Sequence, residues 1–320
     1  MNKLKVGVIG TGHLGRFHSL NYAQIPDADL VGVYDADFEK AKRVAEESQS
    51  RSFENMMELL DQVDGVSVAV PTNHHFHVVQ DVLNHHVHCL VEKPITQTLD
   101  EANTLIALAD EKNLIFQVGQ VERYNPAIAA IQKQGISPQF IEGHRLAPFN
   151  PRGTEVSVIL DLMIHDIDVV LHLVNRPVES LDASGVAVVS DTIDIANARI
   201  RFENGCVANL TASRISQKMM RKMRFFQKDA YITVDFQDKM AEVYQLDDGI
   251  QQADMVLGEI GIGDRKRKVI YRKPEIIGDN ALRFELEAFV KTIQGKIVPA
   301  VSAKEGRDAL AVALQIIDCL

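Results

Sequence analysis

The sequence has few cysteines and no long apolar run. Its three cysteines, Cys89, Cys206 and Cys319, are far apart and form no Cys-x-x-Cys pair. A disulfide framework and a thiolate zinc site are therefore not expected, and a reducing cytoplasm fits. No apolar stretch approaches the roughly 20 residues that span a bilayer, and no apolar signal segment precedes the first strand pattern. We expect a cytoplasmic protein with no membrane partner.

An excess of positive charge is also lacking. The chain has 34 Lys and Arg against 44 Asp and Glu, a formal net charge of -10. A nucleic-acid footprint needs clustered Lys and Arg on a basic domain, so no nucleic-acid partner is expected. The one basic run, Arg265 to Lys268, is interpreted as a solvated loop or edge strand.

A length of 320 residues is long for one hydrophobic core, which favours two domains. Over residues 1–120, short apolar runs alternate with helical periodicity, a pattern typical of βαβ units in a parallel sheet with right-handed crossovers. This predicts an α/β fold whose N-terminal domain is a doubly wound Rossmann sheet. Strands are expected at 4–9, 29–35, 66–70, 87–91 and 115–118, with helices at 14–22, 38–47, 54–60, 75–83 and 100–112.

Residues 121–320 show a different pattern, with longer β-like runs and fewer helices. We expect an α+β domain with a large, open, mainly antiparallel sheet that serves substrate binding and oligomerisation. Asn204-Gly205 predicts a tight hairpin turn. The expected β-runs are 183–190, 193–202, 207–215, 223–226, 230–236, 240–246 and 268–271, and the expected helices are 125–134, 159–174, 280–294 and 303–319.

A Gly-x-Gly-x-x-Gly motif follows the first strand and opens the first helix. In that context it predicts a dinucleotide site. The first glycine permits the tight turn, the second lets the backbone approach the pyrophosphate, and the third lets helix and strand pack closely. The helix N-terminus offers free N–H groups to the phosphates. The motif comprises Gly10, Thr11, Gly12, His13, Leu14 and Gly15.

Asp35 ends the second strand, 20 residues after Gly15. An acidic residue at this spacing binds the adenosine ribose hydroxyls of NAD. Its carboxylate would repel a 2′-phosphate, so NAD is favoured over NADP as the cofactor. The alternative is that Asp35 only caps the next helix.

Lys93 lies in a Glu-Lys-Pro turn directly after the strand that ends at Val91. The carboxyl ends of parallel strands face the ligand crevice of such a sheet. Lys93 could therefore donate a hydrogen bond to a substrate oxygen or to the nicotinamide ribose. The alternative is a surface lysine in a turn before Pro94.

Asp161, His165 and Asp168 fall at i, i+4 and i+7 of a segment that is otherwise apolar. On a helix they share one face. A histidine with a carboxylate one turn away suits general acid–base chemistry near neutral pH. A buried polar network and a metal site are the alternatives.

Two histidine clusters flank the helix expected at 75–83. They lie at its opposite ends, too far apart to join, and we expect no bound metal. The clusters comprise His74, His75 and His77, and His85, His86 and His88.

Four segments together resemble the Gfo/Idh/MocA oxidoreductases: GTGHLGRFHS, VPTNHH, VEKP and DLMIHDID. The resemblance implies that Lys93 sits between nicotinamide and substrate, and that His165 transfers the proton with Asp161 as its partner. It also implies that the loop from Pro71 to His75 borders the cofactor. Residues 155–158 depart from the glycine cluster that the family often has before this helix. The further cofactor residues so implied are Pro71, Thr72, Asn73, His75 and Glu92.

Three segments, QVERYNP at 120–126, DLMIHDID and LTASRIS at 210–216, are similar to a subgroup that oxidises the 3-hydroxyl of UDP-N-acetylglucosamine. This implies a sugar or nucleotide-sugar substrate. Arg152 and Arg214 would be available for a diphosphate, for which arginine is well suited. A structural ion pair is the alternative for both. The implied substrate-binding residues are Arg123, Tyr124, Asn125, Arg152, His165 and Arg214.

The same family includes inositol and other sugar dehydrogenases, biliverdin-reductase-like enzymes and NAD-binding sensor proteins without catalysis. Because Lys93, Asp161 and His165 are all retained, a dehydrogenase that acts on CH–OH groups is favoured. The resemblance also implies a homodimer or homotetramer.

Overall fold

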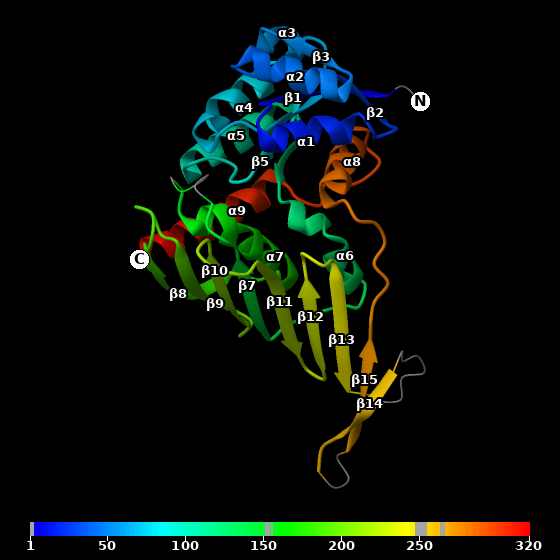
Figure 1. The fold of residues 1–320 in the computed structure, drawn as a ribbon, viewed down its shortest axis with the longest axis vertical. Coiled ribbons are helices and arrows are strands. Elements are labelled where there is room, and N and C mark those ends of the chain that lie inside the picture. The colour runs from blue at the N-terminus through cyan, green and yellow to red at the C-terminus, as the bar shows by residue number, and fades with distance from the viewer. Residues whose placement is uncertain (1–2, 151–153, 155, 247–254, 263–265) are drawn as a thin grey trace. The chain divides into compact units, whose positions relative to one another are not determined.

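The computed structural model describes residues 3–150, 154, 156–246, 255–262 and 266–320. These residues form two compact units (Figure 1). The first unit holds the chain up to Tyr124 together with Asn280–Ala311, and the second holds Asn125–Asp279 and Val312–Leu320. The return of the chain to the first unit was not predicted from the sequence. The expected domain boundary between residues 120 and 121 stays a prediction, because compact units are not shown to be domains that fold independently.

The first unit contains a parallel sheet that has six strands among the residues described. Their order, β3-β2-β1-β4-β5-β6, reverses direction between β1 and β4. This confirms the doubly wound sheet, whose ligand crevice lies at that reversal. The strands are β1 (Leu4–Ile9), β2 (Ala28–Tyr34), β3 (Arg51–Phe53), β4 (Gly65–Val68), β5 (His88–Glu92) and β6 (Phe116–Gly119). Of these, β3 was not expected.

Four helices of the first unit begin at a residue whose side chain caps the first turn, namely Asp37, Asn55, Thr98 and Asn280. Thr98 forms a capping box with Glu101 at the start of α5, which satisfies two backbone N–H groups. The helices are α1 (His13–Tyr22), α2 (Phe38–Ser48), α3 (Met56–Leu60), α4 (His75–Asn84), α5 (Leu99–Lys112) and α8 (Ala281–Ile293), with 3₁₀ turns η1 (Thr72–His74) and η2 (Val121–Tyr124). The last helix, α9 (Ala303–Asp318), runs through parts of the chain that belong to both units.

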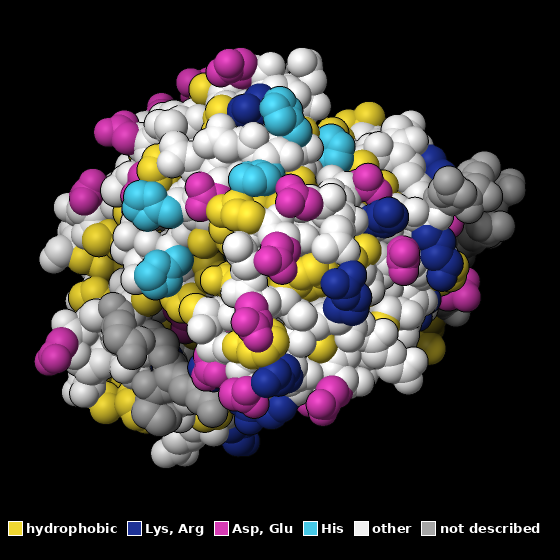
Figure 2. All heavy atoms as spheres, turned by 90° about the horizontal axis from the view of Figure 1, so that it is seen from above, with side chains coloured by type: hydrophobic (Ala, Val, Ile, Leu, Met, Phe, Trp, Pro, Cys, Tyr) yellow, Lys and Arg dark blue, Asp and Glu magenta, His cyan; other side chains and the backbone are white. Residues whose placement is uncertain are grey.

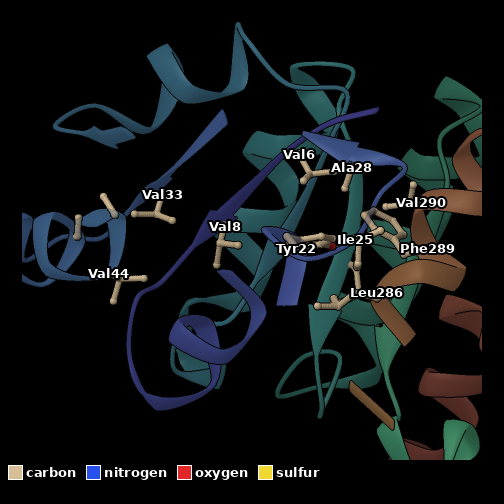
Figure 3. Packing of buried hydrophobic residues seen from close by; sticks show 13 residues of the cluster. Val6, Val8, Tyr22, Ile25, Ala28, Val33, Val44, Leu286, Phe289 and Val290 are labelled. Atoms are coloured by element: carbon tan, nitrogen blue, oxygen red, sulfur yellow. The ribbon is translucent and has the colours of Figure 1, made fainter. Parts of the chain in front are cut away.

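Helix α8 completes the core of the first unit. Leu286 and Phe289 lie in one buried apolar cluster with Val6 and Val8 of β1 and Tyr22 of α1 (Figure 3). Packing of this kind is worth about 1.5–3 kcal/mol for each large apolar side chain that is buried. Residues about 280 positions further along the chain therefore stabilise the strand that precedes the glycine motif.

The second unit is built on one large sheet, in which the described residues form nine strands. Their order is β14-β15-β13-β12-β11-β7-β10-β9-β8, and only the β7–β10 pair within that part of the chain is parallel. The expected mainly antiparallel sheet is confirmed. The strands are β7 (Phe140–Leu146), β8 (Val178–Val186), β9 (Ile195–Phe202), β10 (Val207–Ser213), β11 (Met220–Gln227), β12 (Ala230–Asp235), β13 (Met240–Leu246), β14 (Met255–Ile260) and β15 (Arg267–Arg272).

Two of these strands, β7 and β14, were missed, and β8 lies earlier in the chain than the expected run at 183–190. In β7 buried positions alternate with half-buried ones, as in a strand with one face in the core. Gly143 and Arg145 occupy two of the buried positions, so the sequence shows no alternation of apolar residues there. The side chains of β14 are all exposed, so no alternation marks it.

The second unit also carries short helices against its sheet. Asn125 accepts a hydrogen bond from the N–H of Ala127 and starts the helix in front of Pro126. The expected helix at 159–174 is present, but its first part is a π-helix. The elements are α6 (Pro126–Gln132), the π-helix η3 (Ile159–Met163) and α7 (Ile164–Val174).

Candidate functional site

In the glycine loop of the first unit, two glycines leave no room for a side chain and the third has free space around it. A Cβ added to Gly15 would lie 1.8 Å from the carbonyl oxygen of Gly10, and Gly10 itself has a φ of +90°. Around an added Cβ at Gly12, no described atom comes within 4 Å. The backbone at Gly12 is therefore approachable, as a pyrophosphate requires. Because α1 begins at the next residue, its N-terminal N–H groups lie at the same place.

Asp35 lies beside this loop and is bound to it. Its Oδ2 accepts hydrogen bonds from the backbone N–H of Thr11 at 2.6 Å and from the Thr11 hydroxyl at 3.0 Å. The cap of α2 is Asp37, which accepts from the N–H of Lys40. Helix capping is thus the role of Asp37, and the carboxylate of Asp35 stands at the crevice end of β2. These residues fit the diphosphate and adenosine ribose of a dinucleotide.

Residues of the loop after β4 divide into exposed and buried ones. Pro71 and Asn73 are exposed and Thr72 is half-buried, so these three residues are accessible to a cofactor. His13 and Leu14 on α1 are exposed as well. His75, in contrast, is buried. Its Nδ1 lies 2.8 Å from the carbonyl oxygen of Pro94 and its Nε2 lies 3.0 Å from that of Val70.

Burial lowers the pKa of His75, although its two carbonyl partners oppose the shift. Through its contacts with Val70 and Pro94, the ring connects the loops that follow β4 and β5. Direct contact of His75 with a cofactor stays a prediction.

Lys93 is half-buried and directly follows β5, at the carboxyl edge of the parallel sheet. The residue before it, Glu92, lies 2.8 Å from Nε2 of His18 on α1, and both are buried. Burial raises the pKa of Glu92, but the hydrogen bond and charge of His18, with the nearby Lys93, outweigh it and leave the pKa lowered. The turn thus carries an ionised carboxylate next to the lysine.

The second unit supplies the other predicted catalytic residues. Asp161 lies in the π-helix η3 and His165 in the first turn of α7, and both are half-buried. Asp168, in contrast, is buried. Short π-helical segments are frequent at functional sites, and this one separates Asp161 from the regular register of α7. Lys93 belongs to the first unit and His165 to the second.

A buried ion pair fixes the helix that carries His165. Nε of Arg145 on β7 lies 3.1 Å from both carboxylate oxygens of Asp166, and its second terminal nitrogen lies 2.7 Å from one of them. This bidentate geometry constrains the direction of α7 as well as its distance from the sheet. The sequence interpretation missed the pair, because Arg145 lies in the strand that was not predicted.

Arg214 is held by hydrogen bonds to backbone carbonyl oxygens and by an ion pair. One terminal nitrogen donates to the carbonyl oxygens of Val156 at 2.5 Å and Ile193 at 2.8 Å, and Nε lies 3.3 Å from Oδ1 of Asp194. The residue is 4% exposed. These contacts fit the ion-pair alternative and hold the segment in front of η3. A diphosphate contact of Arg214 stays a prediction.

Asp194 accepts three further N–H hydrogen bonds, from residues 188 to 190. Burial opposes its ionisation, but the hydrogen bonds from Ser190 and its neighbours lower its pKa well below the usual range. The partner of Arg214 is thus a permanent anion. Nothing in the spacing of these residues along the chain had indicated the pair.

The segment QVERYNP places its polar residues in supporting roles. Arg123 is buried, pairs with Glu305 and donates to the carbonyl oxygen of Ala300 at 2.9 Å. Asn125 is the cap of α6. Tyr124 is half-buried, and its contact with substrate stays a prediction. Arg152 lies outside the described residues.

The described part of the chain holds no group of three or more His, Cys, Asp or Glu side chains that could ligate one ion, and Figure 2 shows the imidazoles of one face spread out among other side chains. No helix in that part is both long and apolar enough to cross a membrane.

Comparison with known proteins gives two family matches. Residues 4–120 match the model described as "Oxidoreductase family, NAD-binding Rossmann fold", of the Gfo/Idh/MocA group. Residues 141–233 match the Gfo/Idh/MocA C-terminal domain.

Several curated relatives match over most of their length. The UDP-N-acetylglucosamine 3-dehydrogenase of Acidithiobacillus ferrooxidans is 39% identical over 99% of this chain and 97% of that protein. Its crystal structure covers 100% of this chain and 98% of its own, with a TM-score of 0.89 and 37% identity. The myo-inositol 2-dehydrogenase of Thermotoga maritima is 25% identical over 96% of this chain and 93% of that protein.

Proposed function

Because the chain belongs to the Gfo/Idh/MocA family of NAD-dependent oxidoreductases, we propose that it oxidises a secondary hydroxyl of a sugar. The substrate proposed is UDP-N-acetylglucosamine, and the hydroxyl is that at carbon 3. The observation that carries the proposal is 39% identity, end to end, to an enzyme named for this reaction. The glycine loop, Asp35, Lys93, Asp161 and His165 supply the groups that such a reaction needs.

In the proposed mechanism, His165 takes the proton from the hydroxyl. Lys93 donates a hydrogen bond to the same oxygen and stabilises the negative charge that develops there. Asp161 orients the imidazole and favours its charged form. Bound NAD⁺ accepts the hydride that leaves the carbinol carbon, so the products are a ketone, NADH and a proton on His165.

The sugar-nucleotide contacts are proposed for two of the predicted residues. Tyr124 is a candidate for the sugar and Arg152 for the diphosphate, to which arginine can donate two parallel hydrogen bonds. Arg123, Asn125 and Arg214 each donate a hydrogen bond to a backbone carbonyl oxygen, so we assign them to support of the site.

We further propose that the enzyme acts in the cytoplasm as a homodimer or homotetramer, with the open sheet of the second unit as the contact. Side chains of Phe226, Tyr231 and Tyr244 stack in a row across β11, β12 and β13. Such a row offers the aromatic side chains that are enriched at protein interfaces. Light scattering of the purified protein gives the subunit number, and a monomer at assay concentrations would contradict this proposal.

The function is tested by the absorbance of reduced nicotinamide after the protein is mixed with NAD⁺ and UDP-N-acetylglucosamine. Free glucose and myo-inositol are run in parallel, and semicarbazide is added to a second set to trap a ketone product against an unfavourable equilibrium. NADH with the nucleotide sugar alone supports the proposal. NADH with myo-inositol alone moves the chain to the inositol branch, for which the Thermotoga relative is the supporting observation.

A further inference from the structure

The peptide that carries Lys93 is held on both sides by a buried histidine. On one side His18 binds Glu92, and on the other His75 contacts the carbonyl oxygen of Pro94. We propose that these two histidines are positioning residues, which fix the place and the charge environment of the Lys93 ammonium. The inference rests on the proposed catalytic role of Lys93.

The direction of the first contact follows from the chemistry of its partners. An ionised carboxylate can only accept, so Nε2 of His18 donates to Oε1 of Glu92 across 2.8 Å. The other ring nitrogen, Nδ1, is buried and meets no hydrogen-bond partner among the described residues. The contact to Glu92 is therefore the one hydrogen bond that the ring makes among the described residues, and it is made through Nε2.

The carboxylate of Glu92 is also held in its orientation. Its second oxygen, Oε2, lies 3.3 Å from the backbone N–H of Lys93, the donor in that contact. On the neighbouring strand, a Cβ added to Gly119 would come within 3.1 Å of the Glu92 carboxyl group. The space that Gly119 leaves is filled by this carboxylate, so Glu92 cannot turn away from Lys93 without losing both donors.

The second histidine ties the Lys93 turn to the loop after β4. The two carbonyl oxygens that face His75, those of Pro94 and Val70, belong to different loops. A neutral imidazole has one N–H and can donate to only one of them. Burial of the ring makes that contact rigid, so the residue after Lys93 is fixed against the cofactor side of the sheet.

Anchors of this kind matter because catalysis is sensitive to small displacements. A reacting group that is misplaced by about 1 Å can lose about a hundredfold in rate. A flexible lysine side chain on a mobile turn would sample many such positions. The rival interpretation is that His18 only stabilises the fold, as any buried hydrogen bond does, and the experiment has to separate the two.

The two amide variants of His18 are matched for this purpose. In His18→Gln the amide nitrogen comes near the position of Nε2 and can donate to Glu92. In His18→Asn the shorter amide stays near the position of Nδ1 and cannot. Tyr22→Phe is the control, since it removes a buried 2.8 Å hydrogen bond to Ser67 one turn along the same helix without touching the Lys93 turn.

We expect His18→Asn to lower kcat at least tenfold while the Kd of NADH, measured by its fluorescence, changes less than threefold. His18→Gln should recover most of the loss. Tyr22→Phe should lower the melting temperature and keep kcat. Equal kcat in the Asn and Gln variants would overturn the proposal, as would a loss of NADH affinity that accounts for the loss of turnover. His75→Asn, which keeps a donor for Pro94, should lower kcat less than His75→Leu.

A readout without substrate separates this inference from the proposed function. Trace acetylation, followed by peptide mass spectrometry, compares the labelling rate of Lys93 with that of the exposed Lys133. In His18→Asn, Glu92 takes up a proton more readily and Lys93 holds its own proton less firmly, so its relative labelling should rise at least threefold. Wild-type protein that oxidises no sugar would refute the function and leave this result standing. Unchanged labelling in an active enzyme would refute the inference.

Discussion

The carboxylate of Asp35 is hydrogen-bonded to Thr11, so the acidic end of β2 and the glycine loop form one connected surface. Both contacts are made by Oδ2, whereas Oδ1 accepts from the N–H of Asp37 at 2.9 Å. The adenosine ribose would therefore meet a carboxylate that is already oriented. Ordering it on binding would cost little, which is the physical basis of a preorganised site.

Replacement of Asp35 by alanine should weaken NAD⁺ binding about tenfold to a hundredfold, because hydrogen bonds to a charged group contribute about 1.5–3 kcal/mol. The preference for NAD over NADP should fall at the same time, since the charge that repels a 2′-phosphate is gone. Calorimetric titration of both cofactors measures this. Asp37→Asn, which keeps the helix cap two residues away, is the control, and an Asp35→Ala protein that still excludes NADP would contradict the assignment.

The glycine loop makes a second prediction, in which two similar changes have different effects. Gly12→Val should leave the fold intact and abolish cofactor binding, because its side chain enters the open approach to the backbone. Gly15→Ala should lower the free energy of unfolding by about 1–3 kcal/mol or more, since the new methyl group overlaps the Gly10 carbonyl. Denaturant unfolding and NADH fluorescence, applied to both variants, check the contrast. A Gly12→Val protein that binds NADH normally would place the diphosphate elsewhere.

The sequence predicted those parts of the site that are encoded locally. The turn, the helix start and the acidic strand end of the cofactor site all fall within about 25 residues of one another, so their spacing carries the information. Lys93 and His165 were predicted from the motifs around them, and their catalytic roles stay predictions. The Rossmann sheet followed from the alternation of short strands and helices, and the structure confirms it.

The supporting contacts could not be predicted, because they join residues distant in the chain. His18 and Glu92 are 74 positions apart and belong to different elements. The Arg145–Asp166 pair was hidden for another reason: an arginine at an inward position makes β7 resemble a polar loop. Periodicity indicates which face of an element is buried, and only the folded chain shows what it is buried against.

The Arg145–Asp166 pair should contribute strongly to stability. Asp166→Ala removes the carboxylate that pairs with the buried Arg145, and breaking a buried ion pair from one side costs about 3–5 kcal/mol in other proteins. The matched control is Glu142→Ala on the same strand β7, which removes a partly exposed ion pair with Arg224 of β11. That change should cost about 0–1 kcal/mol. Similar unfolding midpoints in urea for the two variants would show that the buried pair is dispensable.

His75 should make stability depend on pH. Because burial lowers its pKa in the folded state, the unfolded chain takes up a proton first as the pH falls below about 6.5. The stabilising effect of the neutral ring is therefore complete above that pH and is lost as the pH falls toward the folded-state pKa. His88, whose pKa is also lowered by burial, adds an effect of the same sign.

Urea unfolding at a series of pH values between about 5 and 7.5 measures this effect. The loss of stability on acidification should be shallower in His75→Gln than in the wild type. His77→Gln, an exposed residue of the same helix, should keep the wild-type slope. If His75→Gln and the wild type lose stability in parallel, the imidazole takes up its proton at the same pH in the folded and unfolded chains, which would contradict the lowered pKa.

His165 is expected to be the proton-transfer residue, and its removal should affect chemistry without affecting cofactor binding. General acid–base catalysis typically contributes about 10²–10⁴-fold, so kcat of His165→Ala should fall by that factor. The glycine loop and Asp35 lie in the first unit, so the Kd of NADH should stay near the wild-type value.

The control for this change is His172→Ala, seven residues along the same helix α7, where the exposed ring contacts Gln132. It removes an imidazole from the same element and should keep kcat. Stopped-flow measurement of NADH formation with and without deuterium at the reacting carbon sharpens the result. In His165→Ala the hydride step should become slow enough to show the full isotope effect. If His165→Ala keeps a normal kcat, another group accepts the substrate proton, and Asp161 would be the next residue to replace.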